Sequence, residues 1–217
     1  MASVGSERVR HPVFARVYER VAQAGERRSG AVHRRRMVEG LSGRVIEVGA
    51  GSGANFAHYP STVSEVVAVE PEPYLRERAR QAAVDARVQV SVVDGVGGML
   101  PGGAGSFDAG VVALVLCTVP DQEQALAELY RVIRGGGALR FYEHVVAESS
   151  AEARLQRLAD ATFWPRIAGG CHLARDTKAG IERAGFQIER CERFYFSPAP
   201  VIPPDPHILG SALRPIV

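Results

Sequence analysis

Residues 44–53 read RVIEVGAGSG, and this stretch decides the fold. Its first five residues include three β-branched side chains, which is typical of a short buried strand. Three glycines then follow at alternate positions, Gly49, Gly51 and Gly53, so the backbone is able to turn tightly directly after the strand. A strand that runs into a glycine-rich loop is the usual start of a β-α-β unit. We therefore predict a parallel α/β fold that builds outward from this segment.

Strand and helix patterns alternate along the rest of the chain. Strands are predicted over residues 44–50, 63–70, 88–94, 107–116, 138–145, 186–196 and 207–216. Helices are predicted over 71–86, from Asp121 to the glycines at 135–137, over 151–162 with Ser149 and Glu152 as a capping box, and over 176–184. This rhythm predicts a doubly wound, Rossmann-like α/β sheet of mainly parallel strands.

The segment before the glycine loop has helical spacing and a basic charge. Two helices are expected, over residues 11–24 and 30–40. Residues 1–44 carry ten arginines and four glutamates, a net charge of +6, which leaves −4 for the remainder. We interpret residues 1–40 as a helical cap on the same domain as residues 41–217. Two alternatives are open for Phe14 and Tyr18: they close over a bound ligand as a lid, or they belong to a helix that only packs against the body.

Composition excludes several classes of protein. The 217 residues are 46% hydrophobic and carry a formal net charge of +2, which fits one globular domain and disfavours disorder. No apolar run approaches the ~18 residues of a membrane-spanning helix, and no secretory leader opens the chain. The three cysteines, Cys117, Cys171 and Cys191, are far apart and odd in number. We therefore expect a reducing, cytoplasmic location and no integral membrane segment.

The glycine loop pairs with an acidic residue in a nucleoside-binding pattern. Glu70 ends the second predicted strand, 21 residues after Gly49, where a carboxylate is able to accept both ribose hydroxyl protons. The loop reads G-x-G-x-G rather than the G-x-G-x-x-G of dinucleotide sites, and Glu47 precedes it. An anionic side chain there suits the ammonium and sulfonium of S-adenosylmethionine better than a pyrophosphate.

Four segments, residues 47–53, 66–70, 107–120 and 129–137, resemble the signature segments of class I S-adenosylmethionine-dependent methyltransferases. The resemblance implies a seven-stranded sheet with one antiparallel strand, over 207–216, and S-adenosyl-L-methionine as the cofactor. It implies cofactor contacts from Glu47, Gly49, Ala50, Gly51, Gly53, Asn55, Glu70, Pro71, Gly95, Val96 and Leu114. Many relatives have an acidic residue in a GDAxxLP pattern, whereas this chain reads GVGGMLP at 95–101 with Asp94 before it. We therefore expect backbone amides near Val96 and Gly97 to contact the adenine.

Four shorter phrases narrow the resemblance. These are GANF at 53–56 with YP at 59–60, LVLC at 114–117, EHV at 143–145 and GCHL at 170–173. They are similar to the methyltransferase-like seven group, whose members are thiol S-methyltransferases. Those relatives begin with a hydrophobic membrane anchor, whereas this chain begins with an arginine-rich arm. The quinone C-methyltransferase group is also similar, but less so after the fifth strand.

Methyl transfer from a sulfonium is an in-line displacement, so the protein mainly has to position the two reactants and exclude water. His144 ends a predicted strand and is the candidate catalytic base, with a hydrogen-bonded structural histidine as the alternative. The residues expected to contact the substrate are Phe14, Tyr18, Cys117, Glu143, Trp164, Cys171 and His172. No metal site is expected, since neither C-x-x-C nor H-x-x-x-H spacing occurs.

The first hypothesis is a methyltransferase for a small-molecule acceptor, and the specific acceptor we expect is a thiol. The alternative is C- or O-methylation of a quinone, phenol or polyketide-like metabolite. A more distant alternative is an RNA-binding or RNA-modifying protein that uses the basic arm. The chain has no recognised RNA-binding module and an acidic body, so we expect no nucleic-acid partner. The sequence leaves the oligomeric state open.

Overall fold

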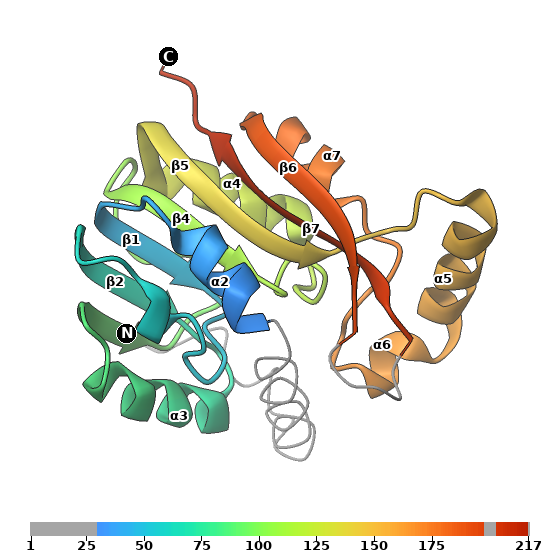
Figure 1. The fold of residues 1–217 in the computed structure, drawn as a ribbon, viewed down its shortest axis with the longest axis horizontal. Coiled ribbons are helices and arrows are strands. Elements are labelled where there is room, and N and C mark those ends of the chain that lie inside the picture. The colour runs from blue at the N-terminus through green and yellow to red at the C-terminus, as the bar shows by residue number, and fades with distance from the viewer. Residues whose placement is uncertain (1–29, 198–202, 217) are drawn as a thin grey trace.

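The computed structural model describes residues 30–197 and 203–216. In this part of the chain, seven strands form one sheet in the order β3-β2-β1-β4-β5-β7-β6 (Figure 1). The strands are β1 (Gly43–Val48), β2 (Val63–Val69), β3 (Gln89–Val93), β4 (Phe107–Ala113), β5 (Ile133–His144), β6 (Gln187–Phe196) and β7 (Asp205–Leu213). The helices are α2 (Ala31–Val38), α3 (Pro73–Val84), α4 (Gln122–Val132), α5 (Ser150–Thr162), α6 (Trp164–Ile167) and α7 (Thr177–Arg183), with a short 3-10 helix η3 (Phe56–His58). The helix predicted over 11–24, with Phe14 and Tyr18, lies outside the described residues.

The strand directions confirm the predicted doubly wound, Rossmann-like fold. Strands β1 to β5 pair in parallel with their neighbours. Strand β7 pairs antiparallel with both β5 and β6. The predicted late antiparallel strand is therefore confirmed, although it begins at Asp205 and ends at Leu213. The parallel strands place their carboxyl ends along one edge of the sheet, which is where this architecture binds ligands.

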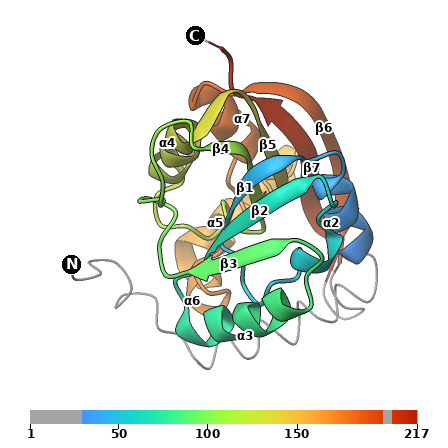
Figure 2. The ribbon, with the colours of Figure 1, turned by 90° about the vertical axis from the view of Figure 1, so that its left-hand side faces the viewer.

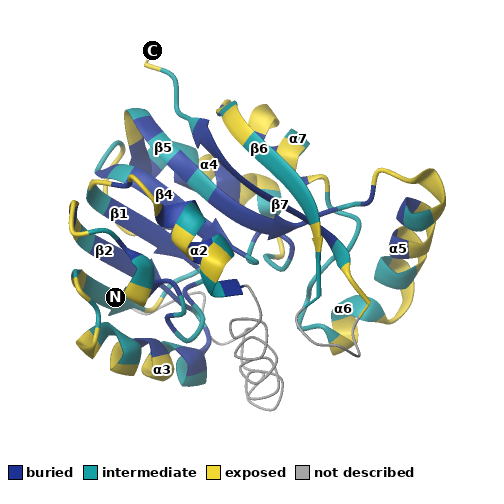
Figure 3. Ribbon diagram, in the orientation of Figure 1, coloured by how far each residue is buried: buried dark blue, intermediate teal, exposed yellow. Residues whose placement is uncertain are grey.

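Helices cover both faces of the sheet (Figure 2). Val45 and Ile46 are adjacent in β1, and their side chains enter two different hydrophobic clusters because successive residues of a strand point to opposite faces. One cluster contains Leu126 and Leu129 of α4 and Ile181 of α7. The other contains side chains of α2 and α3. Figure 3 shows the central strands buried between these layers, which explains apolar runs such as Ala109–Ala113 of β4.

Helices α5 and α6 stand apart from the main body, to one side of the sheet in Figures 1 and 3. Helix α5 begins at Ser150, one residue before the predicted start at 151. The predicted capping box is wrong. The Ser149 side chain makes no cap hydrogen bond, and the Glu152 carboxylate instead accepts a 3.0 Å hydrogen bond from the Tyr195 hydroxyl of β6. Among the described residues, no helix combines the length and apolarity needed to cross a bilayer.

Two further strand boundaries differ clearly from the prediction. Strand β5 begins at Ile133, directly after α4, so the glycines at 135–137 lie inside a strand rather than at the end of a helix. Ile133 pairs with Phe107 and Ala138 with Ala109, so an irregularity of the ladder absorbs these extra glycines. Strand β4 ends at Ala113 because Leu114 has a φ of 59°, a left-handed conformation that terminates the strand.

Candidate active site

The glycine loop lies directly after β1 and crosses to the end of β2. The backbone N–H groups of Gly49 and Ala50 both donate to the Val69 carbonyl, at 2.8 and 3.2 Å. Gly49, Gly51 and Gly53 all have positive φ. A Cβ at Gly49 would lie 2.3 Å from Cγ2 of Val115, whereas a Cβ at Gly51 would meet nothing within 4 Å. The first glycine is thus required by packing, and Gly51 borders open space.

Glu70 lies beside this open space, immediately after β2. It is buried, and its two carboxylate oxygens accept backbone N–H groups from Gly51 at 2.8 Å and from Glu72 at 2.9 Å. Burial raises the pKa of the Glu70 carboxyl, while these two hydrogen bonds act to lower it. A carboxylate oxygen has more than one acceptor site, so each is still able to receive a ribose hydroxyl. A cradle of this kind fits the nucleoside of S-adenosylmethionine.

Glu47 forms a buried polar network behind the loop. Its carboxylate accepts hydrogen bonds from Asn55 Nδ2 at 2.8 Å and from the Tyr59 hydroxyl at 2.6 Å. Arg34 of α2 donates to the Asn55 amide oxygen at 3.0 Å. Burial raises the pKa of Glu47, and Tyr59, Asn55 and Arg34 act to lower it. Tyr59 and Arg34 were absent from the predicted site. Tyr59 belongs to the phrase YP at 59–60 that carries the family resemblance, but no role was predicted for its side chain.

The loop after β3 contains the residues expected near the adenine. Asp94 is exposed, and its Oδ1 accepts from Arg76 Nη1 at 3.0 Å. The same Arg76 nitrogen donates to the carbonyls of Glu70 and Pro71, at 2.9 Å each. Asp94 therefore braces the end of β2 through Arg76. Val96 accepts a 3.1 Å hydrogen bond from the Met99 N–H, which closes a turn at this edge.

A second group of polar side chains lies further along the same edge of the sheet, near the ends of β4 and β5. Cys117 follows β4, His144 is the last residue of β5, and Cys171 lies in the loop after α6. One ligand atom of each, two sulfurs and an imidazole nitrogen, lie within 4.8 Å of one another. The loop is held against β4 by a 2.8 Å hydrogen bond from the His172 N–H to the Cys117 carbonyl. Three of the predicted residues thus meet at one point.

The charges in this cluster are strongly perturbed. The hydrogen bond with Cys117 is the largest of the effects that lower the pKa of Cys171 to about 5, and His144 and Trp164 act in the same direction. Burial acts to lower the pKa of His144, but Asp205 and Cys171 outweigh it and raise that pKa to about 9. Its Nε2 lies 3.1 Å from Oδ2 of Asp205. Asp205, at the start of β7, was not predicted to be part of the site.

Glu143 holds the turn that positions Cys117. Its side chain is buried, and its oxygens accept the N–H groups of Val115 and Leu116, at 3.0 Å each, and of Cys117 at 3.3 Å. Burial raises the pKa of this carboxyl to about 7 against these bonds. Sequence reasoning expected Glu143 to contact the substrate. Both of its oxygens accept hydrogen bonds from the backbone, and its contact with the substrate stays a prediction.

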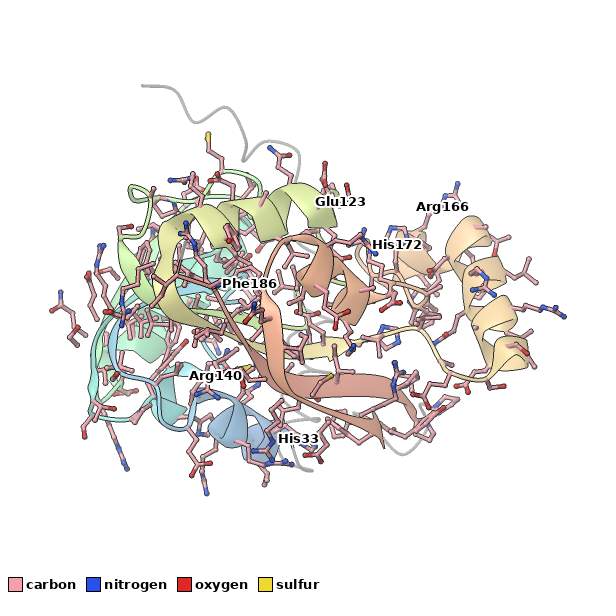
Figure 4. All side chains as sticks on the ribbon, turned by 90° about the horizontal axis from the view of Figure 1, so that it is seen from above. His33, Glu123, Arg140, Arg166, His172 and Phe186 are labelled. Carbon is pink, nitrogen blue, oxygen red and sulfur yellow. The ribbon has the colours of Figure 1, made fainter. Side chains whose placement is uncertain are left out.

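The remaining predicted substrate residues are placed differently from one another. Trp164 is half-buried, and its indole interacts with the Cys171 thiol, whose pKa it acts to lower. The His172 ring is 3.9 Å from Asp160 Oδ2, and Figure 4 shows His172 on the side of the body that faces α6. Two histidines that were not among the predicted site residues lie nearby. His33, labelled on α2 in the same view, stacks on Phe194 with 4.4 Å between the ring centroids. The ring centroid of His207 lies 5.5 Å from that of His144.

A doubly wound sheet, a glycine loop after β1 and a buried acidic residue after β2 together define a nucleoside-binding domain of the Rossmann-like class. Comparison with known proteins identifies it as an S-adenosylmethionine-dependent methyltransferase. The family model described as a methyltransferase domain matches residues 46–141. An S-adenosylmethionine-dependent methyltransferase of Thermotoga maritima superposes with a TM-score of 0.67 at 22% identity, covering 93% of this chain and 97% of that one.

Curated relatives identify the family more closely. Thiol S-methyltransferase TMT1B of Mus musculus is 36% identical over 184 residues, which cover 82% of this chain and 74% of the relative. Thiol S-methyltransferase TMT1A of Homo sapiens is 34% identical over 180 residues, which cover 81% of this chain and 73% of the relative. The chain belongs to the family of these thiol S-methyltransferases, within the class I S-adenosylmethionine-dependent methyltransferases.

Proposed function

We propose that the protein transfers the methyl group of S-adenosylmethionine to the sulfur of a small-molecule thiol. The observation that carries this proposal is the position of the buried cluster of Cys117, His144 and Cys171. The donor cradle lies at the ends of β1 and β2, and this cluster lies one and two strands further along the same edge, at the ends of β4 and β5. The kinship with thiol S-methyltransferases supports the same acceptor.

In the donor half, the glycine loop would lie against the bound cofactor. Gly51 supplies the open space, and the Glu70 oxygens accept the ribose hydroxyls. Glu47, Asn55, Pro71 and the backbone at Gly95, Val96 and Leu114 complete the set of residues that we assign to the cofactor. The bound cofactor supplies an electrophilic methyl group on a sulfonium. The residues of this chain hold it still and exclude water from it.

In the acceptor half, a thiol has to lose its proton, because the thiolate is the nucleophile. His144 is buried, faces two sulfurs and has Asp205 as a carboxylate partner. Because its pKa is raised to about 9, it is an imidazolium at neutral pH, which supports its assignment as the cation that stabilises the acceptor thiolate while the thiol proton leaves to solvent. The acceptor sulfur then attacks the methyl carbon. The electrons of the broken carbon–sulfur bond return to the donor sulfur, giving a thioether and S-adenosylhomocysteine.

The test is a labelling experiment with S-adenosylmethionine that carries a radioactive methyl group. The purified protein is incubated in parallel with small alkyl and aryl thiols, with phenols and quinols, and with short RNA. We expect label in the extracted thioethers, and a fall of at least a hundredfold in the rate for His144→Ala, since activation of a bound nucleophile typically contributes that much. Label found only in the quinols or phenols would overturn the thiol assignment and favour the oxygen or carbon acceptor.

A further inference from the structure

We propose that Cys117, His144 and Cys171 bind one zinc ion, and that a fourth coordination position is left for the acceptor thiolate. The inference rests on the proposed thiol acceptor and specifies how it is activated. The three ligand atoms lie within 4.8 Å of one another. Tetrahedral zinc, with bonds of about 2.3 Å to sulfur and about 2.0 Å to nitrogen, needs its ligand atoms roughly 3.6–3.8 Å apart. Side-chain shifts of about 1 Å would thus close the site.

The chemistry of the ligand set favours this class of ion. Two thiolates and one imidazole are soft to borderline ligands, which suit zinc rather than magnesium or calcium. Zinc sites with four protein ligands are closed, whereas catalytic zinc sites have three protein ligands and one exchangeable position. Among the described residues, the three side chains make up the whole group that could bind an ion here. The set therefore matches the open type.

His144 provides the second, independent observation. Its side chain is 5% exposed, and its Nδ1 is buried without a well-aligned hydrogen bond within the described part of the chain. Buried polar atoms without partners are rare in folded proteins and call for an explanation. Nε2 faces the Asp205 carboxylate at 3.1 Å, which leaves Nδ1 for the ion. A carboxylate on the far side of a histidine ligand is the usual second shell of a zinc site.

The two cysteines are also positioned in advance by their surroundings. The Glu143 carboxylate binds the Cys117 N–H at 3.3 Å. The Cys117 carbonyl accepts the His172 N–H at 2.8 Å, and this bond fixes the neighbouring Cys171 against the same turn. Arg175 Nη1 donates to the Leu116 and Val119 carbonyls, at 2.6 and 2.7 Å, and ties the two segments together a second time. Three separate elements are thus braced around one point.

A bound zinc ion would alter the acceptor rather than the donor. As the acceptor sulfur binds zinc, its S–H bond breaks and the proton leaves to solvent, so that the thiolate persists at neutral pH. Its remaining lone pair attacks the methyl carbon. The carbon–sulfonium bond breaks towards the donor sulfur, and the thioether product is a weaker zinc ligand that dissociates. In this scheme His144 acts through the ion.

The test uses the full chain, freed of metal by a chelator and kept reduced with a phosphine, which contains no thiol. Co²⁺ is then titrated in as a spectroscopic substitute for zinc. We expect saturation at one equivalent, with a sulfur-to-cobalt charge-transfer band and the intense visible bands of tetrahedral cobalt. Addition of a small thiol without S-adenosylmethionine should shift the visible bands. A silent spectrum, or one that the added thiol leaves unchanged, would overturn the site or its open position respectively.

Matched cysteine variants locate the site. Cys171→Ser and His144→Gln should weaken cobalt binding at least tenfold, and Cys171→Ser should also reduce the charge-transfer band. Cys191 is half-buried on β6, outside the cluster, so Cys191→Ser should bind cobalt like the unmodified protein. Equal loss in Cys191→Ser would refute the assignment. Far-ultraviolet circular dichroism establishes that each variant is folded.

Methyl transfer separates this inference from the proposed function. Restoring one equivalent of zinc to the metal-free protein should raise thiol methylation at least tenfold. Undiminished methylation of thiols by the metal-free protein would overturn the zinc site and leave the thiol acceptor standing, with the His144 imidazolium acting directly on the acceptor sulfur. Stoichiometric cobalt binding without methylation of any thiol would overturn the acceptor and leave the metal site standing.

Discussion

Alanine at Gly49 should mainly lower the stability of the fold, whereas alanine at Gly51 should mainly weaken binding of the cofactor. Gly49 and Gly51 have φ values of 68° and 57°, so an added Cβ strains either position by about 1 kcal/mol. At Gly49 the new Cβ would also lie 2.3 Å from Cγ2 of Val115, and such overpacking typically costs a further ~1–3 kcal/mol. At Gly51 the new methyl group enters open space. We expect Gly49→Ala to lose about 2–4 kcal/mol of unfolding free energy and Gly51→Ala about 1 kcal/mol.

For ligand affinity we expect the reverse order: among the variants that remain folded, Gly51→Ala should lose more affinity than Gly49→Ala. The Gly51 methyl group would occupy the space assigned to the cofactor, so Gly51→Ala should bind S-adenosylhomocysteine at least tenfold more weakly, which corresponds to about 1.4 kcal/mol. Gly40→Ala is the matched control. Gly40 has a φ of 73° and nothing within 4 Å of an added Cβ, and it lies just after α2, outside the loop. It should lose the same ~1 kcal/mol of stability and no affinity.

The measurements are urea unfolding followed by circular dichroism and titration calorimetry with S-adenosylhomocysteine. Equal affinity of Gly51→Ala and Gly40→Ala would refute the assignment of the open space to the cofactor. Equal stability of Gly49→Ala and Gly51→Ala would refute the packing argument, because only the first substitution creates a collision. The two readouts therefore test the loop's structural and ligand-binding roles separately.

Two further stability changes follow from single hydrogen bonds. Tyr59→Phe removes the hydroxyl that donates to the buried Glu47 carboxylate at 2.6 Å, and it should lower the free energy of unfolding in urea by about 2 kcal/mol. Tyr195→Phe, on the exposed surface, is the control and should lower it by less than ~0.5 kcal/mol. Equal losses in the two variants would contradict the role of burial. Arg134 lowers the pKa of Asp108, so the folded-state value is below the unfolded one and the stabilisation exists above about pH 4. Asp108→Asn should therefore lose at most ~1 kcal/mol at pH 7 and progressively less as the pH falls below 4 and through the lowered pKa of the folded state. A difference that is undiminished at low pH or in high salt would exclude the ion pair as its cause.

The fold was predictable because its signals are local. The buried parallel strands contain short apolar runs, such as Val66–Val69 in β2 and Ala109–Ala113 in β4. Asp121 caps α4 by accepting the Gln124 N–H at 2.9 Å, as its sequence position indicates. The start of β5 was not predictable in the same way. Glycines after a helix normally mark its end, but here the pairing of Ile133 with Phe107 draws the chain into the sheet before they are reached. A long-range contact thus overrode a local pattern.

Glu143 shows the corresponding limit for a functional residue. Its place beside His144 at the end of a strand predicts contact with the substrate. The three hydrogen bonds that its carboxylate accepts from the turn after β4 were not predictable, because they depend on how that turn packs. In the structure the two side chains alternate, as neighbours in a strand must. One is bonded to the turn after β4 and the other faces Cys171. Because Glu143 and His144 are adjacent in one strand, their side chains point to opposite faces of the sheet and have different partners.

The cluster of two cysteines and a histidine eluded the spacing rules for a physical reason. Those rules detect ligands on one helix or one tight loop, such as C-x-x-C, whereas Cys117, His144 and Cys171 lie on three separate elements. Parallel pairing of β4 with β5 brings Cys117 and His144 together at one sheet edge, and that proximity follows from strand order alone. The position of Cys171 depends on the bonds that fold its loop back onto the turn at Cys117. Sheet topology therefore predicts two of the three ligands, and only the packed loop supplies the third.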